Sequence, residues 1–426
     1  MLFQRLRNRF SKERDYLGGT SLDQRYLLVS VFLYALALPM ITTFSNTYLW
    51  RQSQDPVVLA VFNIGYFSGL SLGFMINGLF LRRFSPQKLC ALGCVLQGVV
   101  PMVLVFLGAQ ADTYAIALGL CLGVSAGFYW GNRNLVTSRV SQGPGRYKYL
   151  TFENIVQIFS AVLAPFFVGW FLVLGEQTGV YSVQTAYQIA AIVAFFLLVL
   201  SGRSIAGVQE VFPSVKVLLV KQASRVWDRM RVLDFFNGCA SGLEAALLFF
   251  ALLTFLDQEN AIGSLLSFTA VLAALGMYIL GKRVKHRDHA AILGLWASVT
   301  LVGKIAFAVL YSTVGAIILQ LVEGLMKSFR WASMSAVMYE AVEHEQPDTQ
   351  DSQRYAYIMD REFVLNLGRV SALTVVVVVY QLHPTELIRY GLLSVVVFQI
   401  LMISLTRIVT RETQHVDKIP VARVSV

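Results

Sequence analysis

Long apolar segments recur along the whole chain, separated by short polar stretches. A helix needs about 20 apolar residues to cross the hydrocarbon of a bilayer, and about twelve segments reach that length. We expect spans at 26–49, 56–81, 87–109, 113–137, 149–174, 181–202, 231–256, 261–281, 290–312, 313–339, 358–381 and 386–409. The pattern therefore predicts an all-α membrane protein with twelve transmembrane helices.

Basic residues gather in every second connection between these segments. The basic set, with the two terminal segments, contains Arg5, Arg7, Arg9, Lys12, Arg14, Arg82, Arg83, Lys88, Arg139, Arg146, Lys148, Lys216, Lys221, Arg225, Arg229, Lys282, Arg283, Lys285, Arg287, Arg354, Arg411, Lys418 and Arg423. The other connections offer little beyond Arg51 and Arg389. Because cytoplasmic loops carry an excess of Lys and Arg, we expect a multi-pass protein of the plasma (inner) membrane with both termini cytoplasmic.

Composition agrees with this interpretation. Of the 426 residues, 56% are hydrophobic and 14% are charged, whereas about a quarter are charged in a typical soluble domain. The net charge of +10 is explained by the basic loops, so we expect no nucleic-acid partner. The four cysteines lie in apolar segments, and we interpret them as free thiols. The basic N-terminus is not followed directly by an apolar core, so it is not a cleavable signal peptide.

Two short motifs occur twice, in the same order, in the two halves of the chain. GFYWGNRNLVTS (127–138) matches GLMKSFRWASMS (324–335) in the spacing of Gly, Arg and Ser. RYKYLTFEN (146–154) and RYAYIMDRE (354–362) share Arg-Tyr-x-Tyr just before a new span. Two matches at equivalent spans indicate a duplicated six-helix unit.

These boundaries predict five parts. They are a cytoplasmic N-terminal segment (1–25), a six-helix bundle (26–202), a cytoplasmic linker (203–230), a second six-helix bundle (231–410) and a cytoplasmic tail (411–426). The linker contains SVKVLLVKQASRVWDRM, with apolar residues broadly on one side and basic residues bordering them. This stretch is either an amphipathic helix on the inner leaflet or a plain tether.

Two six-helix halves, a long central link and two cytoplasmic ends resemble the major facilitator superfamily (MFS) of secondary transporters. The family signature between the second and third spans is only partly kept in GLFLRRFSPQK (78–88), where Gly78 and Arg83 match but Arg82 replaces the acidic residue. APFFVG (164–169) keeps Pro165 and Gly169 of a run found in exporters, a slight indication of efflux. The resemblance implies that the first, fourth, seventh and tenth spans line a central cavity around which the halves rock.

The tenth span carries three charges on one face, because Glu323, Lys327 and Arg330 are spaced i, i+4 and i+7. Glu323 and Lys327 lie roughly 15 and 21 Å along this helix, near the middle of the bilayer. Charges at that depth are expensive and should face water or a partner. Either Glu323 and Lys327 pair with each other, or Lys327 binds an anionic group of a substrate while Glu323 exchanges protons. The two accounts are compatible, because protonating Glu323 would release Lys327.

Other charges near the span ends predict structural pairs. We expect Arg133 to meet Glu153, and its repeat mate Arg330 to meet Glu362 or Asp360. Such pairs would act as latches within each half. Arg369, with Glu362 and Asn366 on the same face, is expected to join this network.

The seventh span presents a polar stripe made by Asp234, Asn237, Ser241 and Glu244. Glu244 lies near mid-membrane and is a second candidate for proton coupling; the alternative is a hydrogen-bonded structural acid. Lys304 in the ninth span is also deep, and we expect it to have an internal partner or to snorkel.

Aromatic and amide side chains complete the predicted substrate site. Trp130 aligns with Lys327 in the repeat and is the candidate for an aromatic wall, with Tyr34 and Asn46 from the first span and Asn237 from the seventh. Aromatic rings beside isolated charges suit an amphiphilic or aromatic organic ion. The alternative is that these aromatics only pack or anchor the helices.

The sequence thus predicts a proton-coupled secondary transporter for a small organic, anionic or amphiphilic solute, acting as a monomer in the bilayer. A lipid or lipid-linked headgroup flippase on the same fold is the alternative. All five histidines lie in predicted loops or the tail, and HExxH and P-loop motifs do not occur. We therefore expect no enzyme, metal or cofactor.

Overall fold

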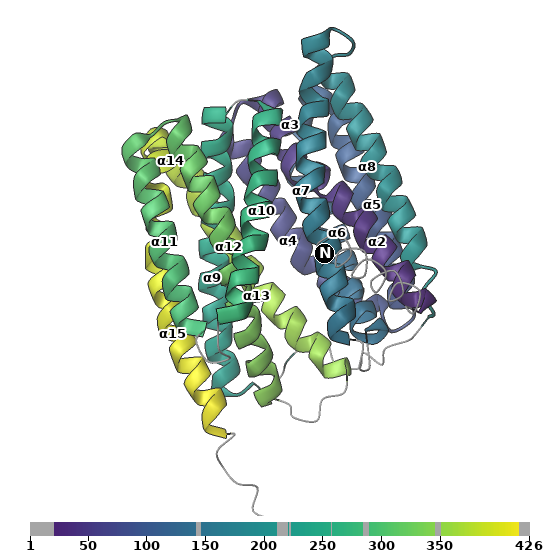
Figure 1. Cartoon of the computed structure of the whole chain (residues 1–426), viewed down its shortest axis with the longest axis vertical. Helices are drawn as coiled ribbons and strands as arrows, with labels where there is room; N and C mark the ends of the chain where they lie inside the picture. Colours follow the sequence, from purple (N-terminus) through teal and green to yellow (C-terminus); the bar gives the residue numbers. More distant parts are fainter. Residues whose placement is uncertain are drawn as a thin grey trace, which may run out of the picture.

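The computed structural model describes residues 21–141, 146–210, 220, 223–256, 258–283, 289–345 and 351–416. Its described residues form helices that run side by side from one end of the molecule to the other (Figure 1). The first half of the chain packs on one side, and the second half packs beside it. We call the end at which the first helix begins the termini end and the opposite end the far end.

The first half holds six membrane-length helical rods. Its elements are α2 (Leu22–Pro39), η1 (Met40–Phe44), α3 (Ser45–Ser53), α4 (Pro56–Phe80), α5 (Pro86–Leu107), η2 (Gly108–Ala111), α6 (Ala115–Val140), α7 (Arg146–Thr178) and α8 (Val183–Ile205). The rod α2–η1–α3 is continuous, and η1 is a π-helical turn directly after Pro39. Proline lacks the N–H that the regular ladder needs, so the winding changes there.

The second half repeats this layout. Its elements are α9 (Arg225–Leu256), α10 (Glu259–Arg283), α11 (His289–Leu310), α12 (Thr313–Glu345), α13 (Asp351–Leu382), α14 (Pro384–Tyr390), η3 (Gly391–Ser394) and α15 (Val395–Val416). Helix α9 begins inside the segment expected to be linker, where the Ser224 hydroxyl accepts hydrogen bonds from the backbone N–H groups of Val226 and Trp227. Within the stretch expected to be an amphipathic helix (214–230), residues 214–219 and 221–222 lie outside the described residues, and 225–230 form the first turns of α9.

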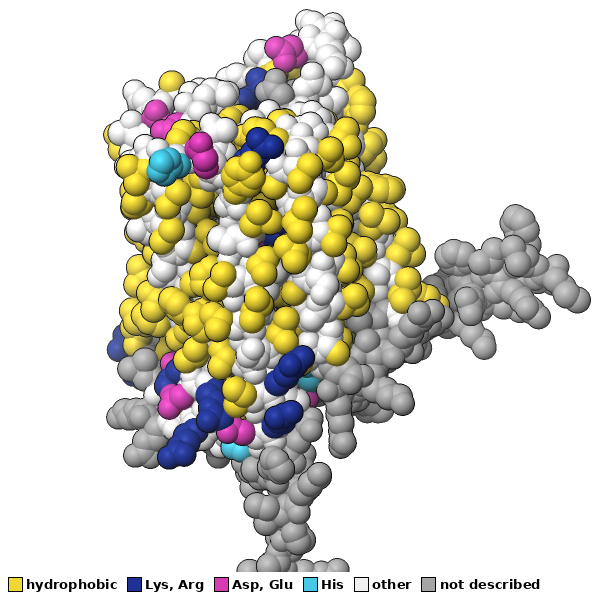
Figure 2. Space-filling view, turned by 90° about the vertical axis from the view of Figure 1, so that its left-hand side faces the viewer, with side chains coloured by type: hydrophobic (Ala, Val, Ile, Leu, Met, Phe, Trp, Pro, Cys, Tyr) yellow, Lys and Arg dark blue, Asp and Glu magenta, His cyan; other side chains and the backbone are white. Residues whose placement is uncertain are grey.

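Among the described residues, eleven helical segments are long and apolar enough to cross a membrane. Figure 2 shows the corresponding surface, a broad apolar band with charged side chains gathered mainly at the two ends. The chain is therefore a multi-pass membrane protein. Helix α12 is not among the eleven, because Glu323, Lys327 and Arg330 interrupt its apolar sequence. It is nevertheless as long as its neighbours, so a twelfth span remains a prediction that rests on α12.

The packing order of the helices is the same in the two halves. In the first half α2 packs on α7 and α8, and α6 packs on α4 and α5. In the second half α9 packs on α13 and α15, and α12 packs on α10 and α11. The halves meet where α4 packs on α13 and where α7 packs on α10. In the repeat α4 corresponds to α10 and α7 corresponds to α13, so each of these contacts is the symmetry equivalent of the other. This symmetry supports the duplication inferred from the motifs.

The far end is closed by an ion pair between the halves. Arg51 of α3 contacts Glu259 of α10, and the Tyr187 hydroxyl of α8 donates to Glu259 at 3.0 Å. The Glu259 side chain is 1% exposed and that of Arg51 is 38% exposed. Beside the pair is a cavity of about 400 Å³ whose lining includes Trp50, Glu176 and Leu253.

Glycines let α7 and α10 touch at this level. A Cβ on Gly169 would lie 2.5 Å from the carbonyl oxygen of Glu259, and one on Gly263 would lie 2.2 Å from that of Pro165. The two backbones are thus too close for larger residues at these positions.

A neutral contact joins the halves toward the termini end. The Tyr355 hydroxyl of α13 donates to the Phe74 carbonyl at 2.8 Å and accepts from Asn77 Nδ2 at 3.0 Å. Asn132 Nδ2 in turn donates to Asn77 at 2.6 Å. Tyr355 and Met359 of the second half are buried in an apolar cluster supplied mainly by the first half.

We predict that Glu259→Gln loosens the far end, because the substitution removes the charge that holds Arg51 across the interface. The reporter is Leu253→Cys, because Leu253 lies beside this cavity and is only 3% exposed. The exposed Cys121 is replaced by Ser so that it does not react with the label. Labelling of Leu253→Cys by a membrane-impermeant maleimide should become several-fold faster. Tyr355→Phe, at the opposite contact, should leave the rate unchanged, and the exchange Arg51→Glu with Glu259→Arg should restore slow labelling. Equal rates in the parent and Glu259→Gln would contradict the prediction.

Candidate functional site

Four charged side chains from three helices meet in the middle of the second half. Lys304 of α11 lies 3.3 Å from Glu244 of α9 and 3.1 Å from Glu323 of α12, measured from Nζ to Oε1 in both cases. Arg330 Nη1 of α12 donates to Glu244 Oε2 at 2.6 Å. We call Glu244, Lys304, Glu323 and Arg330 the buried quartet. Two acids and two bases balance its charge.

Surrounding groups fix the cations of the quartet. Lys304 is completely buried, and its Nζ also lies 3.5 Å from the Thr300 hydroxyl. Arg330 lies over the Trp296 ring at 5.0 Å. The ninth span, expected to be peripheral, therefore supplies a lysine that links α9 and α12, the two helices expected to line the cavity. This is the internal partner that was expected for Lys304.

Of the two accounts of Glu323 and Lys327, the pair between them was wrong, because it is not formed. Glu323 is buried and contacts Lys304 instead. The Lys327 side chain is exposed although it lies near the middle of α12. Among the described residues, it has neither an ion-pair partner nor a hydrogen bond. Glu244, Glu323, Arg330 and Arg369 all lie within electrostatic range of it.

The expected pairing of Arg330 with Glu362 or Asp360 was also wrong. In the first half Arg133 does contact Glu153, which is 3% exposed. Glu153 lies seven residues after Arg146, but the equivalent position after Arg354 is Arg361. The repeat therefore puts a cation where Arg330 would need an acid, and Arg330 turns to Glu244. A latch role for the Arg133–Glu153 pair stays a prediction.

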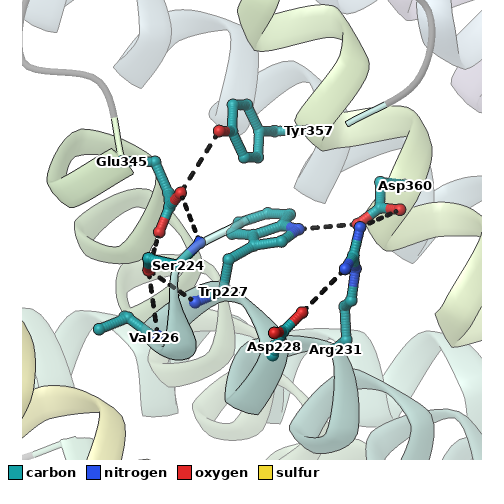
Figure 3. A network of polar contacts seen from close by, with 8 residues as sticks. All are labelled: Ser224, Val226, Trp227, Asp228, Arg231, Glu345, Tyr357 and Asp360. Atoms are coloured by element: carbon teal, nitrogen blue, oxygen red, sulfur yellow. Dashed lines mark hydrogen bonds and ion pairs between the residues drawn. The ribbon is translucent and has the colours of Figure 1, made fainter. Parts of the chain in front are cut away.

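Asp360 belongs to a separate network at the base of α9 (Figure 3). Arg231 donates to it through Nε at 2.7 Å and through Nη2 at 3.0 Å, and Trp227 Nε1 donates at 2.7 Å. Glu345 at the end of α12 accepts from the Ser224 backbone N–H at 3.2 Å and from the Tyr357 hydroxyl at 3.4 Å. These contacts tie the start of α9 to α12 and α13.

Glu362 likewise forms an ion pair with the adjacent residue, Arg361. Its Oε1 accepts from Arg361 Nη1 at 3.1 Å, and Arg361 lies 3.4 Å from Asp234 of α9. Asp234 therefore serves a structural contact between α9 and α13.

Arg369 has no acidic partner within the described part of the chain, so its expected place in an ion-pair network was wrong. Its Nε donates to Ser241 Oγ at 3.2 Å, and its Nη1 donates to Asn366 Oδ1 at 2.7 Å. The guanidinium lies 4.9 Å from the centre of the Phe67 ring of α4, across the interface between the halves.

The first half presents stacked aromatic rings. Tyr34 and Tyr129 stack with their centroids 3.6 Å apart, and Trp130 meets both edge-on at 5.8 and 5.1 Å. The Tyr34 hydroxyl donates to Gln97 at 2.9 Å. Asn46 instead bonds within its own half, where it accepts from Asn63 at 2.9 Å. Asn237 is buried on α9.

Tyr66 of α4 connects the aromatic and the charged sides. It lies within electrostatic range of Tyr34 in the first half and of Arg369 in the second. Tyr34 and Trp130 therefore lie on the same side of the interface as Tyr66, and Lys327 and Arg369 lie across from it.

Sequence reasoning missed two features of this arrangement. The first is the Arg51–Glu259 pair, although Arg51 stood out as one of two basic residues in the poorly charged loops. The second is Arg369 as a cation without an acid. The signal for it was Arg361, which occupies the position equivalent to Glu153 in the repeat. Arg361 pairs with Glu362, so this acid does not pair with Arg369.

Comparison with solved structures identifies the fold. The human organic anion transporter MFSD10 (TETRAN) superposes with a TM-score of 0.61 at 14% identity, covering 90% of this chain and 98% of that one. The peptide transporter POT, a mutant in complex with alafosfalin, gives 0.64 at 14% identity, with coverage of 91% and 95%. A POT family transporter in complex with 5-aminolevulinic acid gives 0.67 at 11% identity, with coverage of 91% and 96%.

Sequence comparison adds relatives but no activity. No family model matches the chain. It is 23% identical over 372 residues to the uncharacterized protein YqgE of Bacillus subtilis (strain 168). The aligned region covers 84% of each chain. It is 27% identical over 170 residues to an uncharacterized protein in the sodM 3' region of Geobacillus stearothermophilus, covering 40% of this chain and 76% of that one. The structural matches confirm that the chain has the fold of the MFS transporters.

Proposed function

We propose that the chain is a secondary active transporter that moves a small organic anion by alternating access between its two halves. The observation that carries this proposal is Lys327, an exposed cation near the middle of a membrane helix with no acidic partner among the residues described. An isolated charge at that depth is costly. A solute anion would supply the missing partner each time the site is filled.

Charge balance supports an anionic solute. The buried quartet is neutral, since Glu244 and Glu323 offset Lys304 and Arg330. Lys327 and Arg369 then add two positive charges without acids. On the other half, the partly buried Trp130 ring and the buried Tyr34 ring that it contacts suit an apolar or aromatic body. One structural neighbour, MFSD10, is an organic anion transporter, and another binds 5-aminolevulinic acid, which carries a carboxylate beside its ammonium group.

Proton coupling is the second part of the proposal, with Glu323 as the proton-exchanging group and Glu244 held by two cations. Protonating Glu323 would change the quartet from neutral to singly positive, one turn from Lys327. An anion would then bind more tightly and, by linkage, anion binding would favour proton uptake. The direction of transport stays a prediction: Gly169 of the exporter-like segment already has a packing role against α10.

The flippase alternative makes a different demand on the same site. A lipid headgroup could use Lys327, but its acyl chains would need a lateral opening. Counterflow of a water-soluble anion in proteoliposomes, without movement of labelled lipid between leaflets, would separate the two functions.

We predict that Lys327→Ala abolishes transport of organic anions, while Lys327→Arg retains part of it. A ligand-stabilisation screen on purified protein would find the solute, and the same ligands would then be tested on each variant. Arg389→Gln, a cation removed at the far end, is the matched control. A ligand that stabilises wild type and Lys327→Ala equally would exclude Lys327 as the binding charge.

For Glu323→Gln we predict that solute exchange survives but no longer responds to a pH gradient, because the amide cannot release a proton. Proteoliposomes with and without an imposed gradient would measure this. Gradient-driven accumulation at the wild-type level in Glu323→Gln would refute the coupling role of this residue.

Removing Lys304 should destabilise the protein strongly, since it would leave two buried carboxylates facing each other. Breaking a buried ion pair typically costs about 3–5 kcal/mol, so Lys304→Met should lower the unfolding temperature. Adding Glu323→Gln should recover part of the loss. An unchanged unfolding temperature in the single variant would show that the quartet is not held by Lys304.

A further inference from the structure

The environment of Arg369 contains hydrogen-bond donors that lack acceptors. Its Nε and Nη1 are occupied by Ser241 and Asn366, but Nη2 has no hydrogen-bond partner among the described side chains and backbone. Asn366 is 1% exposed, and while its Oδ1 accepts from Arg369, its buried Nδ2 has no partner. An amide nitrogen left unpaired at such burial is unfavourable.

Lys327 adds a third donor of the same kind. It lies near the middle of α12, as Arg369 and Asn366 do in α13, and both helices flank α9. Arg369 and Lys327 lie within electrostatic range of each other. Their charges repel each other, so an anion near both would stabilise both.

We propose that Arg369, Asn366 and Lys327 form one carboxylate-binding site, and that the solute is an organic carboxylate with an apolar ring. This inference rests on the proposed function and names the solute class of the same site. Three donors without a matching acceptor select an anion over a neutral amide or an amine. The carboxylate oxygens accept from Arg369 Nη2, Asn366 Nδ2 and Lys327 Nζ, and the ring lies toward Tyr34 and Trp130.

Phe67 gives this site a link to the movement of the halves. The Arg369 guanidinium rests on its ring from the opposite half, a contact stabilised by cation–π attraction. A bound carboxylate therefore fixes Arg369 at the interface, where α4 packs against α13. Arg369 is both a solute ligand and a contact between the halves.

The experiment measures thermal stabilisation of the purified full-length protein by aryl carboxylates, each paired with its primary amide. Benzoate with benzamide and 2-naphthoate with 2-naphthamide are the probes. We expect at least one carboxylate to stabilise wild type while its amide does not. In Arg369→Gln its apparent affinity should fall roughly tenfold or more. Arg369→Lys should fall between the two, because it keeps the charge but loses the planar fork.

Controls separate lost binding from lost folding. Asn366→Leu keeps both cations and should weaken the carboxylate by a smaller factor, while Arg389→Gln should bind like wild type. Equal affinity in wild type and Arg369→Gln, or equal stabilisation by carboxylate and amide, would overturn the site. So would a panel in which no carboxylate binds. Carboxylate binding without any uptake into proteoliposomes would instead leave this site intact and reject the transport function.

Discussion

A charged side chain near the middle of a membrane is stable only beside an opposite charge, a set of hydrogen-bond partners or water. Most charges in the second half of this protein satisfy the first condition. Glu244 and Glu323 share Lys304 and Arg330, and Asp234 meets Arg361. Lys327 and Arg369 do not meet an acid among the described residues. This imbalance is the basis for proposing an anion-binding site rather than a set of ion pairs that only holds helices together.

The two contacts between the halves differ in chemistry. At the far end Arg51 meets the buried carboxylate of Glu259, whereas toward the termini end Tyr355 hydrogen-bonds to Asn77 and a backbone carbonyl. Alternating access requires each contact to break in turn. The ionic contact is the more sensitive of the two to charge-changing substitutions, and the neutral contact depends on apolar burial around Tyr355.

Hydrophobic length and repeated motifs predicted the fold well, because both are local properties of the sequence; the orientation expected from loop charge stays a prediction. They also identified Glu323, Lys327 and Arg330 as one face of a helix. Partners were harder to predict, since they depend on which neighbouring helix approaches that face. Arg330 illustrates this: the repeat suggested an acid on α13, but Arg361 occupies that position and Glu244 of α9 takes its place. Lys304 reached the quartet from a helix that topology alone places at the periphery.

The central claim is that the cations lie between two halves that move against each other. Distances between spin labels test it most directly, with one pair at exposed Gln52 and Gln258 of the far end and another at exposed Arg83 and Arg225 of the termini end. A carboxylate that binds the protein should shorten one distance and lengthen the other. Two distances that stay fixed, or that change in the same direction, would contradict the account.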